Sequence, residues 1–225
     1  MDKIKAIITG ATGMVGEGVL HECLKNDDVE QVLVVGRRSC EVVHTKLTEI
    51  VHRDFFDLSA IEDRLGGYDA CFFCLGSSSV GVSEEEYFQM TYELTMSFAK
   101  ALVTKNPEMT FCYVSGKGTD STEKGRLNWA RVKGKTENDL MKLPFKGVFA
   151  FRIGFVKPNK NYKNTVRNYK YLGWLYPVVK AISGNLASTL EEVGLAMINA
   201  VKAGDSRKVL EVRDIIELAQ IGNAR

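Results

Sequence analysis

The sequence predicts an α/β protein whose central parallel sheet carries helices on both faces, a doubly wound arrangement. Short apolar and β-branched runs alternate with helical patterns almost from end to end, which is typical of that fold class. A glycine-rich turn joins the first predicted strand to the first predicted helix, at residues 10–16. With 225 residues, 45% of them hydrophobic, the chain is long enough for one well-buried core but short for two. We therefore expect residues 1–225 to form a single domain.

Seven strands are predicted from runs of apolar and β-branched residues, at 4–9, 30–35, 48–52, 69–74, 109–114, 147–152 and 208–212. Between them, apolar residues recur at helical spacing from 15 to 23 and from 87 to 101. Two helix starts have the spacing of a capping box, at Ser83 with Glu86 and at Thr189 with Glu192.

The alternation of strands and helices lapses between about 156 and 188. An aromatic, apolar segment with basic edges occupies residues 169–182. Because it follows the sixth strand, near the edge where open α/β sheets bind ligands, we interpret residues 155–188 as a small C-terminal cap that faces the substrate. Peripheral contact with a membrane surface and contact between two copies in a homodimer remain alternatives for this segment.

Charge and cysteine content exclude several classes of partner. The net charge is only +2, and the 30 basic and 28 acidic residues are spread along the chain, so we expect no nucleic-acid partner. The N-terminus lacks the pattern of a signal peptide, and no apolar run approaches the ~20 residues of a membrane span. Five cysteines, an odd number, fit a reducing compartment and predict a cytoplasmic protein. Cys71 and Cys74 should point to opposite faces of a strand, which favours core packing over a metal or redox pair.

The glycine-rich turn reads Gly-Ala-Thr-Gly-Met-Val-Gly, with a strand pattern before it and a helical pattern after it. Glycines permit a tight turn and let a pyrophosphate approach the backbone, while the helix N-terminus supplies unpaired amides and a favourable dipole. The alternative is that the glycines serve only chain reversal and helix–sheet packing. We predict a dinucleotide-binding turn made of Gly10, Thr12, Gly13, Met14, Val15 and Gly16.

With this GxxGxxG spacing, residues 4–156 resemble the short-chain dehydrogenase/reductase superfamily, in particular its extended and atypical branches. The resemblance implies a Rossmann-type fold. It also implies that Asp54, with Phe55 after it, lies at the adenine amino group, although Asp54 has an alternative role as an ordinary turn residue. The loop Leu75-Gly76-Ser77 matches the segment that passes beside the cofactor.

The choice of dinucleotide depends on the end of the second strand. NAD-preferring sites usually place an acidic side chain there, but this chain has Gly36-Arg37-Arg38. Two guanidinium groups suit a 2′-phosphate, which arginine binds through charge-assisted hydrogen bonds. We therefore expect Arg37 and Arg38 to favour NADP(H) over NAD(H). The alternatives are a solvated basic loop and a carboxylate supplied by a neighbouring loop.

The resemblance further implies a catalytic serine after the fifth strand and a Tyr-x-x-x-Lys pair on the next helix. Ser115 and Lys133 match, but the tyrosine position holds Trp129. Residues four apart share a helix face, so Trp129 should lie beside Lys133, yet indole is no general acid near neutral pH. Lys117, Tyr113 and Tyr92 are candidate replacement donors.

Further segments, at 35–38, 73–77, 115–118, 132–137 and 151–154, are similar to Tat-interacting-protein-type oxidoreductases and to bacterial nucleoside-diphosphate-sugar epimerase-like proteins. Ile153, expected beside the nicotinamide, stands where those proteins usually have proline. Little chain remains after the sixth strand, which favours a small carbonyl or hydroxyl substrate over a nucleotide sugar. We expect an NADP(H)-dependent oxidoreductase or epimerase-like enzyme, in which Lys133 orients the ribose and Ser115 binds the reacting oxygen. A catalytically silent, dinucleotide-binding regulatory or scaffold protein is the alternative.

Overall fold

The computed structural model describes residues 3–157, 159, 162–164 and 186–221. The aromatic segment at 169–182 lies outside the described residues. Its interpretation as a cap, a membrane contact or a dimer contact therefore stays a prediction.

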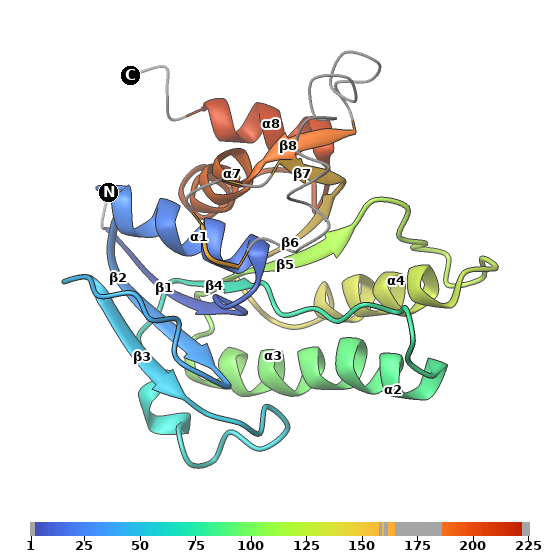
Figure 1. Ribbon diagram of the computed structural model, residues 1–225, viewed down its shortest axis with the longest axis horizontal. Coiled ribbons are helices and arrows are strands. Elements are labelled where there is room, and N and C mark those ends of the chain that lie inside the picture. The colour runs from blue at the N-terminus through green and yellow to red at the C-terminus, as the bar shows by residue number, and fades with distance from the viewer. Residues whose placement is uncertain (1–2, 158, 160–161, 165–185, 222–225) are drawn as a thin grey trace.

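Seven parallel strands form the main sheet in the order β3-β2-β1-β4-β5-β6-β9 (Figure 1). Their bounds are Ile4–Thr9 for β1, Val29–Gly36 for β2, Leu47–Val51 for β3, Ala70–Phe73 for β4, Thr110–Gly116 for β5, Gly147–Ile153 for β6 and Val209–Glu211 for β9. Each of the seven predicted strands is confirmed. Because β1 pairs with β2 on one side and with β4 on the other, the strand order reverses at β1, and its carboxyl end marks the place where such sheets bind ligands.

Helices cover both faces of this sheet, as the sequence predicts (Figure 1). One face carries α1 (Met14–Lys25), α7 (Leu190–Ala203) and α8 (Val212–Gln220). The other carries α2 (Glu84–Phe88), a π-helical turn (Gln89–Glu93), α3 (Leu94–Lys105) and α4 (Asn128–Leu140). A short 3-10 turn, Glu62–Arg64, precedes β4. The chain therefore has the Rossmann-type, doubly wound architecture.

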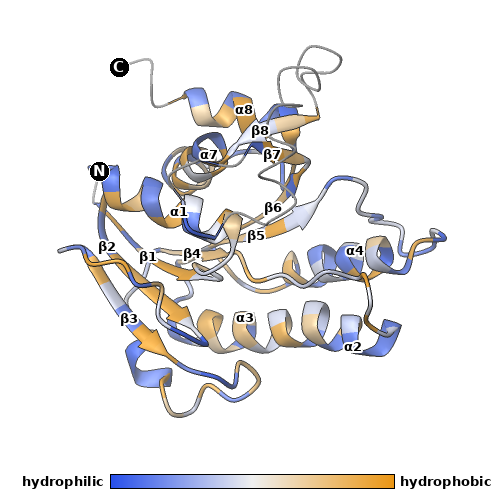
Figure 2. Cartoon of the chain, in the orientation of Figure 1, coloured by the Kyte–Doolittle hydropathy of each residue, from blue (hydrophilic) through white to orange (hydrophobic). Residues whose placement is uncertain are grey.

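Successive side chains along the strands point to opposite faces of the sheet and pack into two hydrophobic cores, one on each face. Ile8 packs with α1 and α7, whereas its neighbour Ile7 packs with α3. The same alternation separates Cys71 from Cys74, which lie in different cores and do not form a pair. Figure 2 shows the consequence, since the central strands are largely apolar while polar residues gather on the outer helix faces and loops.

The helix starts differ in how completely they are capped. Thr189 and Glu192 form the predicted capping box: the amide of Glu192 donates to the Thr189 hydroxyl at 3.0 Å, and the amide of Thr189 donates to the Glu192 carboxylate at 2.7 Å. At Ser83 only the first half of the capping box is present: the Glu86 amide donates to the Ser83 hydroxyl at 3.1 Å. Both predicted helix starts are confirmed.

Two short strands were not predicted. β7 (Phe155–Lys157) and β8 (Ala187–Thr189) pair in parallel as a separate two-stranded sheet, β7 at the start of the predicted cap and β8 across its end. Three residues are too few to show the alternation by which longer strands are recognised. Their pairing joins segments that lie about thirty residues apart in the sequence.

Candidate functional site

The three glycines of the β1–α1 turn have three different tasks. Gly10 has a φ of 71°, and a Cβ there would lie 2.6 Å from the Cys74 carbonyl group. A Cβ on Gly16 would overlap the backbone of Gly10, so this glycine allows α1 to start close to the turn. At Gly13 the nearest atom to an added Cβ is the Gly10 carbonyl oxygen at 3.3 Å, and otherwise the position faces open space. Chain reversal, close packing and access for a ligand are thus divided among the three.

Helix α1 begins directly over this turn. Gly13 is its N-cap and offers no side chain to cap the first amides, and Met14 and Val15 are the half-buried first residues of the helix. An uncapped helix N-terminus presents N–H groups and the positive end of the helix dipole. Those features match the predicted binding of a pyrophosphate.

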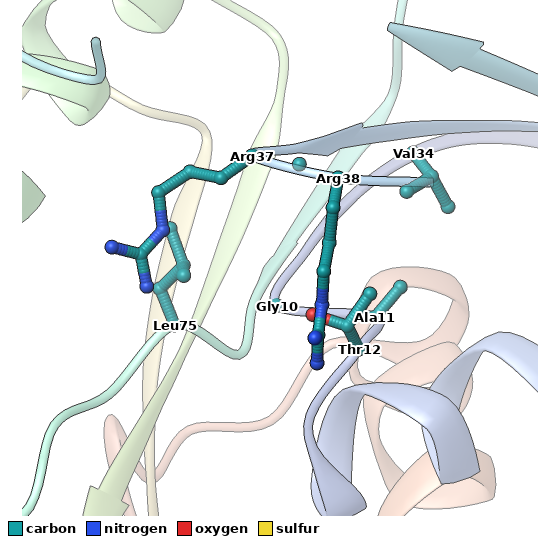
Figure 3. A pocket seen from close by; sticks show the side chains of 8 residues that line it. Gly10, Ala11, Thr12, Val34, Arg37, Arg38 and Leu75 are labelled. Atoms are coloured by element: carbon teal, nitrogen blue, oxygen red, sulfur yellow. The ribbon is translucent and has the colours of Figure 1, made fainter. Parts of the chain in front are cut away.

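A pocket of about 510 Å³ opens beside the turn. The ends of β1 and β2 and the loop after β4 supply its walls, and its lining residues are Gly10, Ala11, Thr12, Val34, Gly36, Arg37, Arg38 and Leu75. Figure 3 shows the Arg38 side chain extending along Ala11 and Thr12, while Arg37 extends toward Leu75. The structure therefore brings the predicted phosphate turn and both predicted arginines to the same pocket.

Asp54 and Phe55 follow β3, and their side chains have local partners. One Asp54 carboxylate oxygen accepts hydrogen bonds from the amides of Phe56 at 2.9 Å and Asp57 at 3.3 Å, which is the geometry of an aspartate-capped turn. Phe55 is buried and stacks on Phe98, with ring centroids 5.5 Å apart. The turn role considered for Asp54 is thus present, and Phe55 can offer a cofactor only its backbone.

The loop after β4 lies at the same edge of the sheet. Leu75 is half-buried and lines the pocket, and Gly76 and Ser77 are exposed immediately after it. Register explains the placement, because β4 runs parallel to β1 and ends beside it, with Thr9 opposite Phe73.

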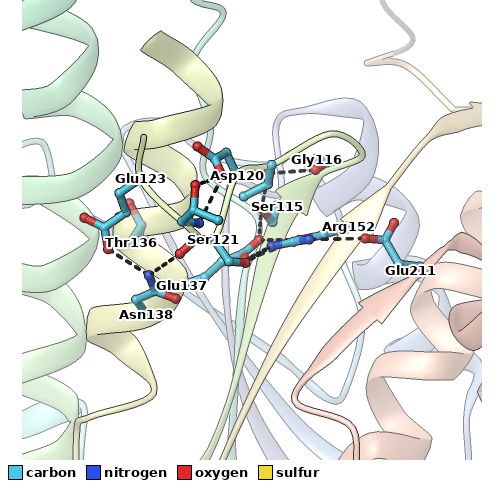
Figure 4. Close-up of polar contacts among 12 residues, drawn as sticks. Ser115, Gly116, Asp120, Ser121, Glu123, Thr136, Glu137, Asn138, Arg152 and Glu211 are labelled. Atoms are coloured by element: carbon cyan, nitrogen blue, oxygen red, sulfur yellow. Dashed lines mark hydrogen bonds and ion pairs between the residues drawn. The ribbon is translucent and has the colours of Figure 1, made fainter. Parts of the chain in front are cut away.

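Ser115, near the end of β5, is buried within a polar network rather than exposed at the sheet edge. Its hydroxyl donates to the Glu137 carboxylate at 2.5 Å and lies 3.1 Å from the Thr119 hydroxyl. The guanidinium of Arg152, on β6, donates to both Glu137 oxygens, at 2.6 and 3.1 Å, and reaches Glu211 on β9 at 3.3 Å (Figure 4). The network joins β5, α4, β6 and β9.

Glu137 and Arg152 belong to segments that carried the family resemblance, but no role was predicted for either. A signal was present in the sequence, because an arginine inside an apolar strand needs an anion when it is buried. The Glu137 side chain is fully buried and that of Arg152 nearly so, which makes this a buried ion pair.

Trp129 and Lys133 lie side by side over the turn that follows β5, as the helical spacing predicts. A Cβ on Gly116 would touch both the Trp129 ring and the Lys133 side chain at 3.9 Å. Gly118, with a φ of 89°, would place a Cβ 3.4 Å from the same ring. Two glycines therefore let the indole pack onto the turn.

The Lys133 ammonium group lies 5.3 Å from the centroid of the Tyr113 ring. Burial lowers the pKa of Lys133 to about 8, while the Glu137 carboxylate one helical turn away acts in the opposite direction. This lysine can therefore exchange a proton much nearer to neutral pH than an exposed one.

The two tyrosines considered as replacement acids have other surroundings. Burial raises the pKa of Tyr113, whose side chain lies inside the core. The Tyr92 hydroxyl donates to Asp139 at 2.8 Å, and burial together with that carboxylate raises its pKa. The backbone amide of Lys117 donates to the carbonyl of Ile153 at 2.8 Å, which holds the turn after β5 against the half-buried end of β6.

The described residues present neither a metal-binding cluster nor a membrane-spanning helix. No group of three or more His, Cys, Asp or Glu side chains there is arranged to hold a metal ion. No helix within the same ranges is both long and apolar enough to cross a bilayer.

The site fits a nicotinamide dinucleotide on three counts. The turn leaves room above Gly13, the uncapped N-terminus of α1 favours the binding of an anion, and two cationic side chains line the pocket. Arg37 and Arg38 would lie at the adenosine end of the dinucleotide, the turn would hold the pyrophosphate, and Lys133, on α4 beside the turn that follows β5, would contact the nicotinamide ribose.

Fold and site together define an NAD(P)-binding protein of the short-chain dehydrogenase/reductase type. The model of the NAD dependent epimerase/dehydratase family matches residues 6–124, and the chain belongs to that family. The predicted resemblance to this superfamily is confirmed, and with it the expectation of a nicotinamide dinucleotide as cofactor.

Among curated proteins, the chain is similar over nearly its whole length to Protein FMP52-2, mitochondrial, of Scheffersomyces stipitis. The two are 26% identical over 227 residues, which cover 97% of this chain and 96% of the relative. Protein FMP52, mitochondrial, of Saccharomyces cerevisiae is 25% identical over 67% of this chain. These names contradict the predicted cytoplasmic location. Free cysteines reflect the redox state of a compartment and do not identify it.

Solved structures share the fold. ADP-L-glycero-D-manno-heptose-6-epimerase of Helicobacter pylori is 16% identical, with a TM-score of 0.68 over 97% of this chain and 82% of its own. A short chain dehydrogenase of Burkholderia cenocepacia in complex with NADP is 13% identical, with a TM-score of 0.66 over 99% of this chain and 94% of its own. The second shows that a chain of nearly the same extent holds this cofactor.

Proposed function

We propose that this protein is an NADP(H)-dependent oxidoreductase or epimerase-like enzyme that acts on a small carbonyl or hydroxyl substrate. The observation that carries the proposal is the pocket in which Arg37 and Arg38 lie beside the glycine turn. A carboxylate at the end of β2 is typical of NAD-preferring sites, whereas two guanidinium groups suit a 2′-phosphate.

A bound nicotinamide dinucleotide supplies or accepts a hydride. In the proposed reaction, Lys133 binds and orients the nicotinamide ribose. Ser115 binds the reacting oxygen, for which its hydroxyl has to turn away from Glu137. Because Trp129 supplies no acidic proton, a lysine takes the place of the tyrosine as proton donor. Lys133 is the first candidate, since burial already lowers its pKa to about 8, and Lys117 is the second.

We propose a single domain over residues 1–225, in which residues 155–188 cap the substrate side. β7 and β8 support this division, since their pairing holds together the chain that enters and the chain that leaves the segment.

The preference for NADP(H) is tested by titrating the protein with NADPH and with NADH and following fluorescence. The unmodified protein should bind NADPH more tightly, and replacing Arg37 and Arg38 together by alanine should abolish the difference. Equal affinities in the unmodified protein, or tighter binding of NADH, would contradict the assignment of the arginines.

Trp129 specifically favours a second candidate, a dinucleotide-binding regulatory or scaffold protein without turnover. A screen of small carbonyl compounds that follows NADPH absorbance separates the two. Turnover that Lys133→Ala abolishes supports the enzyme, while tight NADPH binding without turnover on any compound supports the second candidate.

A further inference from the structure

The loop that carries Arg37 and Arg38 is held by a carboxylate from the neighbouring strand. Glu49 lies in the middle of β3, opposite Val34 of β2. One of its oxygens accepts a hydrogen bond from the Cys40 amide at 2.5 Å, and the other accepts from the Ser39 hydroxyl at 2.8 Å. Both oxygens are therefore bonded to the two residues that directly follow the arginine pair.

The same loop has further internal bonds. The Ser39 hydroxyl accepts from the amide of Glu41, whose φ of 57° turns the chain. The Gly36 carbonyl, before the arginines, accepts from the His52 amide at 2.9 Å. Cys40 is buried, while the two arginines are exposed. The backbone is thus fixed on both sides of the arginines, although their long side chains extend into the pocket.

From these contacts we propose that Glu49 is a positioning residue: it holds the loop that places Arg37 and Arg38 at the 2′-phosphate of the dinucleotide. Glu49 thereby contributes to the specificity of the protein for NADP(H). This inference rests on the proposed binding of NADP(H) by Arg37 and Arg38. Fixing the backbone of the loop reduces the conformational entropy that the two arginines lose when they close on a phosphate.

A carboxylate near an anion site has two opposed effects on NADPH affinity. The direction in which the affinity changes when Glu49 is removed therefore tests the inference. As a bare charge, Glu49 repels a phosphate, and its removal should tighten the binding of NADPH. As the anchor of the loop, it helps to hold the arginines in place, and its removal should weaken that binding. A third possibility is that Glu49 binds the ribose hydroxyls of NAD, in which case its removal should weaken NADH most.

The test measures the affinity of unmodified protein and variants for NADPH, NADH and adenosine 2′,5′-bisphosphate. Glu49→Ala should weaken NADPH and the bisphosphate about tenfold, the equivalent of one to two hydrogen bonds, and change NADH less than about twofold. Ser39→Ala removes one hydrogen bond to Glu49 from an exposed position. It should weaken NADPH and the bisphosphate in the same direction, but less. Glu41→Gln serves as the matched control, because it removes a neighbouring charge without touching the bonds to Glu49.

Each outcome decides the question. Unchanged or tighter NADPH binding in both Glu49→Ala and Ser39→Ala overturns the inference, as does a larger loss for NADH than for NADPH. An equal loss of NADPH affinity in Glu41→Gln would show that the loss does not depend on the bonds to Glu49, and would overturn the inference as well. The unmodified protein tests the proposed function separately: without a preference for NADPH both proposals fail, whereas a preference that survives Glu49→Ala removes only the role of Glu49.

Discussion

Lys133 is half-buried, and its ammonium group lies over the ring of Tyr113, 5.3 Å from the ring centroid. Charge in such surroundings is costly, and the cost is visible as a pKa lowered to about 8 from the ordinary value of 10.5. A lysine perturbed in this way lowers the stability of the fold, and perturbed pKa values of this kind are common at active sites.

Lys133→Met should raise the free energy of unfolding at pH 7 by on the order of 1–3 kcal/mol. Below pH 8 the lysine is charged in both states, and only the folded state bears the cost of burying that charge. Between pH 8 and 10.5 the folded protein releases the proton first, so the stability deficit of the unmodified protein shrinks as the pH rises. Denaturant titrations of both proteins across this range measure the difference. If the difference in free energy of unfolding between the two proteins stays constant with pH, the pKa of Lys133 is not lowered in the folded state.

Gly13→Val should abolish dinucleotide binding and leave a folded protein. An added Cβ meets only the Gly10 carbonyl oxygen at 3.3 Å, so we expect the fold to adjust, while the valine side chain fills the space over the turn that a pyrophosphate needs. Circular dichroism reports the fold and calorimetry the binding. Gly16→Val is the contrasting variant, because its side chain would collide with the backbone of Gly10 and should disrupt folding itself. NADPH binding that survives Gly13→Val would contradict the placement of the pyrophosphate.

At the scale of elements, the ion pair between Glu137 and Arg152 ties the ends of four elements together. α4 supplies the carboxylate, β6 the guanidinium, β5 the Ser115 hydroxyl, and β9 the second carboxylate at Glu211 (Figure 4). A buried pair of this kind fixes an arrangement of elements, although it contributes less net stability than its short distances suggest.

Removing one partner of this pair should lower the free energy of unfolding more than removing both partners does. Glu137→Leu leaves the Arg152 charge largely buried without its main partner, and should destabilise the protein by about 3–5 kcal/mol. Arg152→Met should cost a similar amount for the opposite reason. The double variant should recover a large part of either loss, because no uncompensated buried charge remains. Urea denaturation of the four proteins closes the cycle, and strictly additive losses would show that the two side chains act independently.

At the scale of the whole molecule, the candidate site is assembled from three separate segments that meet at the carboxyl edge of the sheet. The β1–α1 turn and the β2 loop supply the dinucleotide pocket, and the turn after β5 with the start of α4 supplies Trp129 and Lys133. Trp129 differs from the family pattern at the position where a proton donor is expected. Its replacement by tyrosine therefore tests proton transfer at the assembled site.

Trp129→Tyr should raise or create reductase activity with NADPH. If the layout of the superfamily is kept, the phenol lies beside Lys133, whose charge favours the phenolate and makes proton transfer feasible near neutral pH. The smaller ring leaves a gap over Gly116 and Gly118, with an expected loss of on the order of 1–3 kcal/mol. Thermal unfolding therefore accompanies the kinetics. Trp129→Phe is the matched control, since it leaves a similar gap without a hydroxyl. An active parent whose folded, NADPH-binding tyrosine variant gains nothing must use another acid.

Features that depend on local spacing were determined by the sequence itself. The seven main strands follow from apolar runs, the dinucleotide turn from glycines between a strand and a helix, and the proximity of Trp129 and Lys133 from a separation of four on a helix. Each of these needs only a few neighbouring residues, because backbone geometry repeats every two residues in a strand and every 3.6 in a helix.

Contacts between distant segments were decided only by the tertiary structure. Ser115 matches a catalytic serine in sequence, yet its hydroxyl is bonded to Glu137, twenty-two residues further along the chain. Phe55 follows the residue that the resemblance places at the adenine, but it packs into the core against Phe98. The pairing of β7 with β8 joins segments from either end of the predicted cap. The bonds of Glu49 to the arginine loop are of the same kind. Such contacts depend on how elements pack in three dimensions, and no local pattern specifies which buried partner a polar side chain will find.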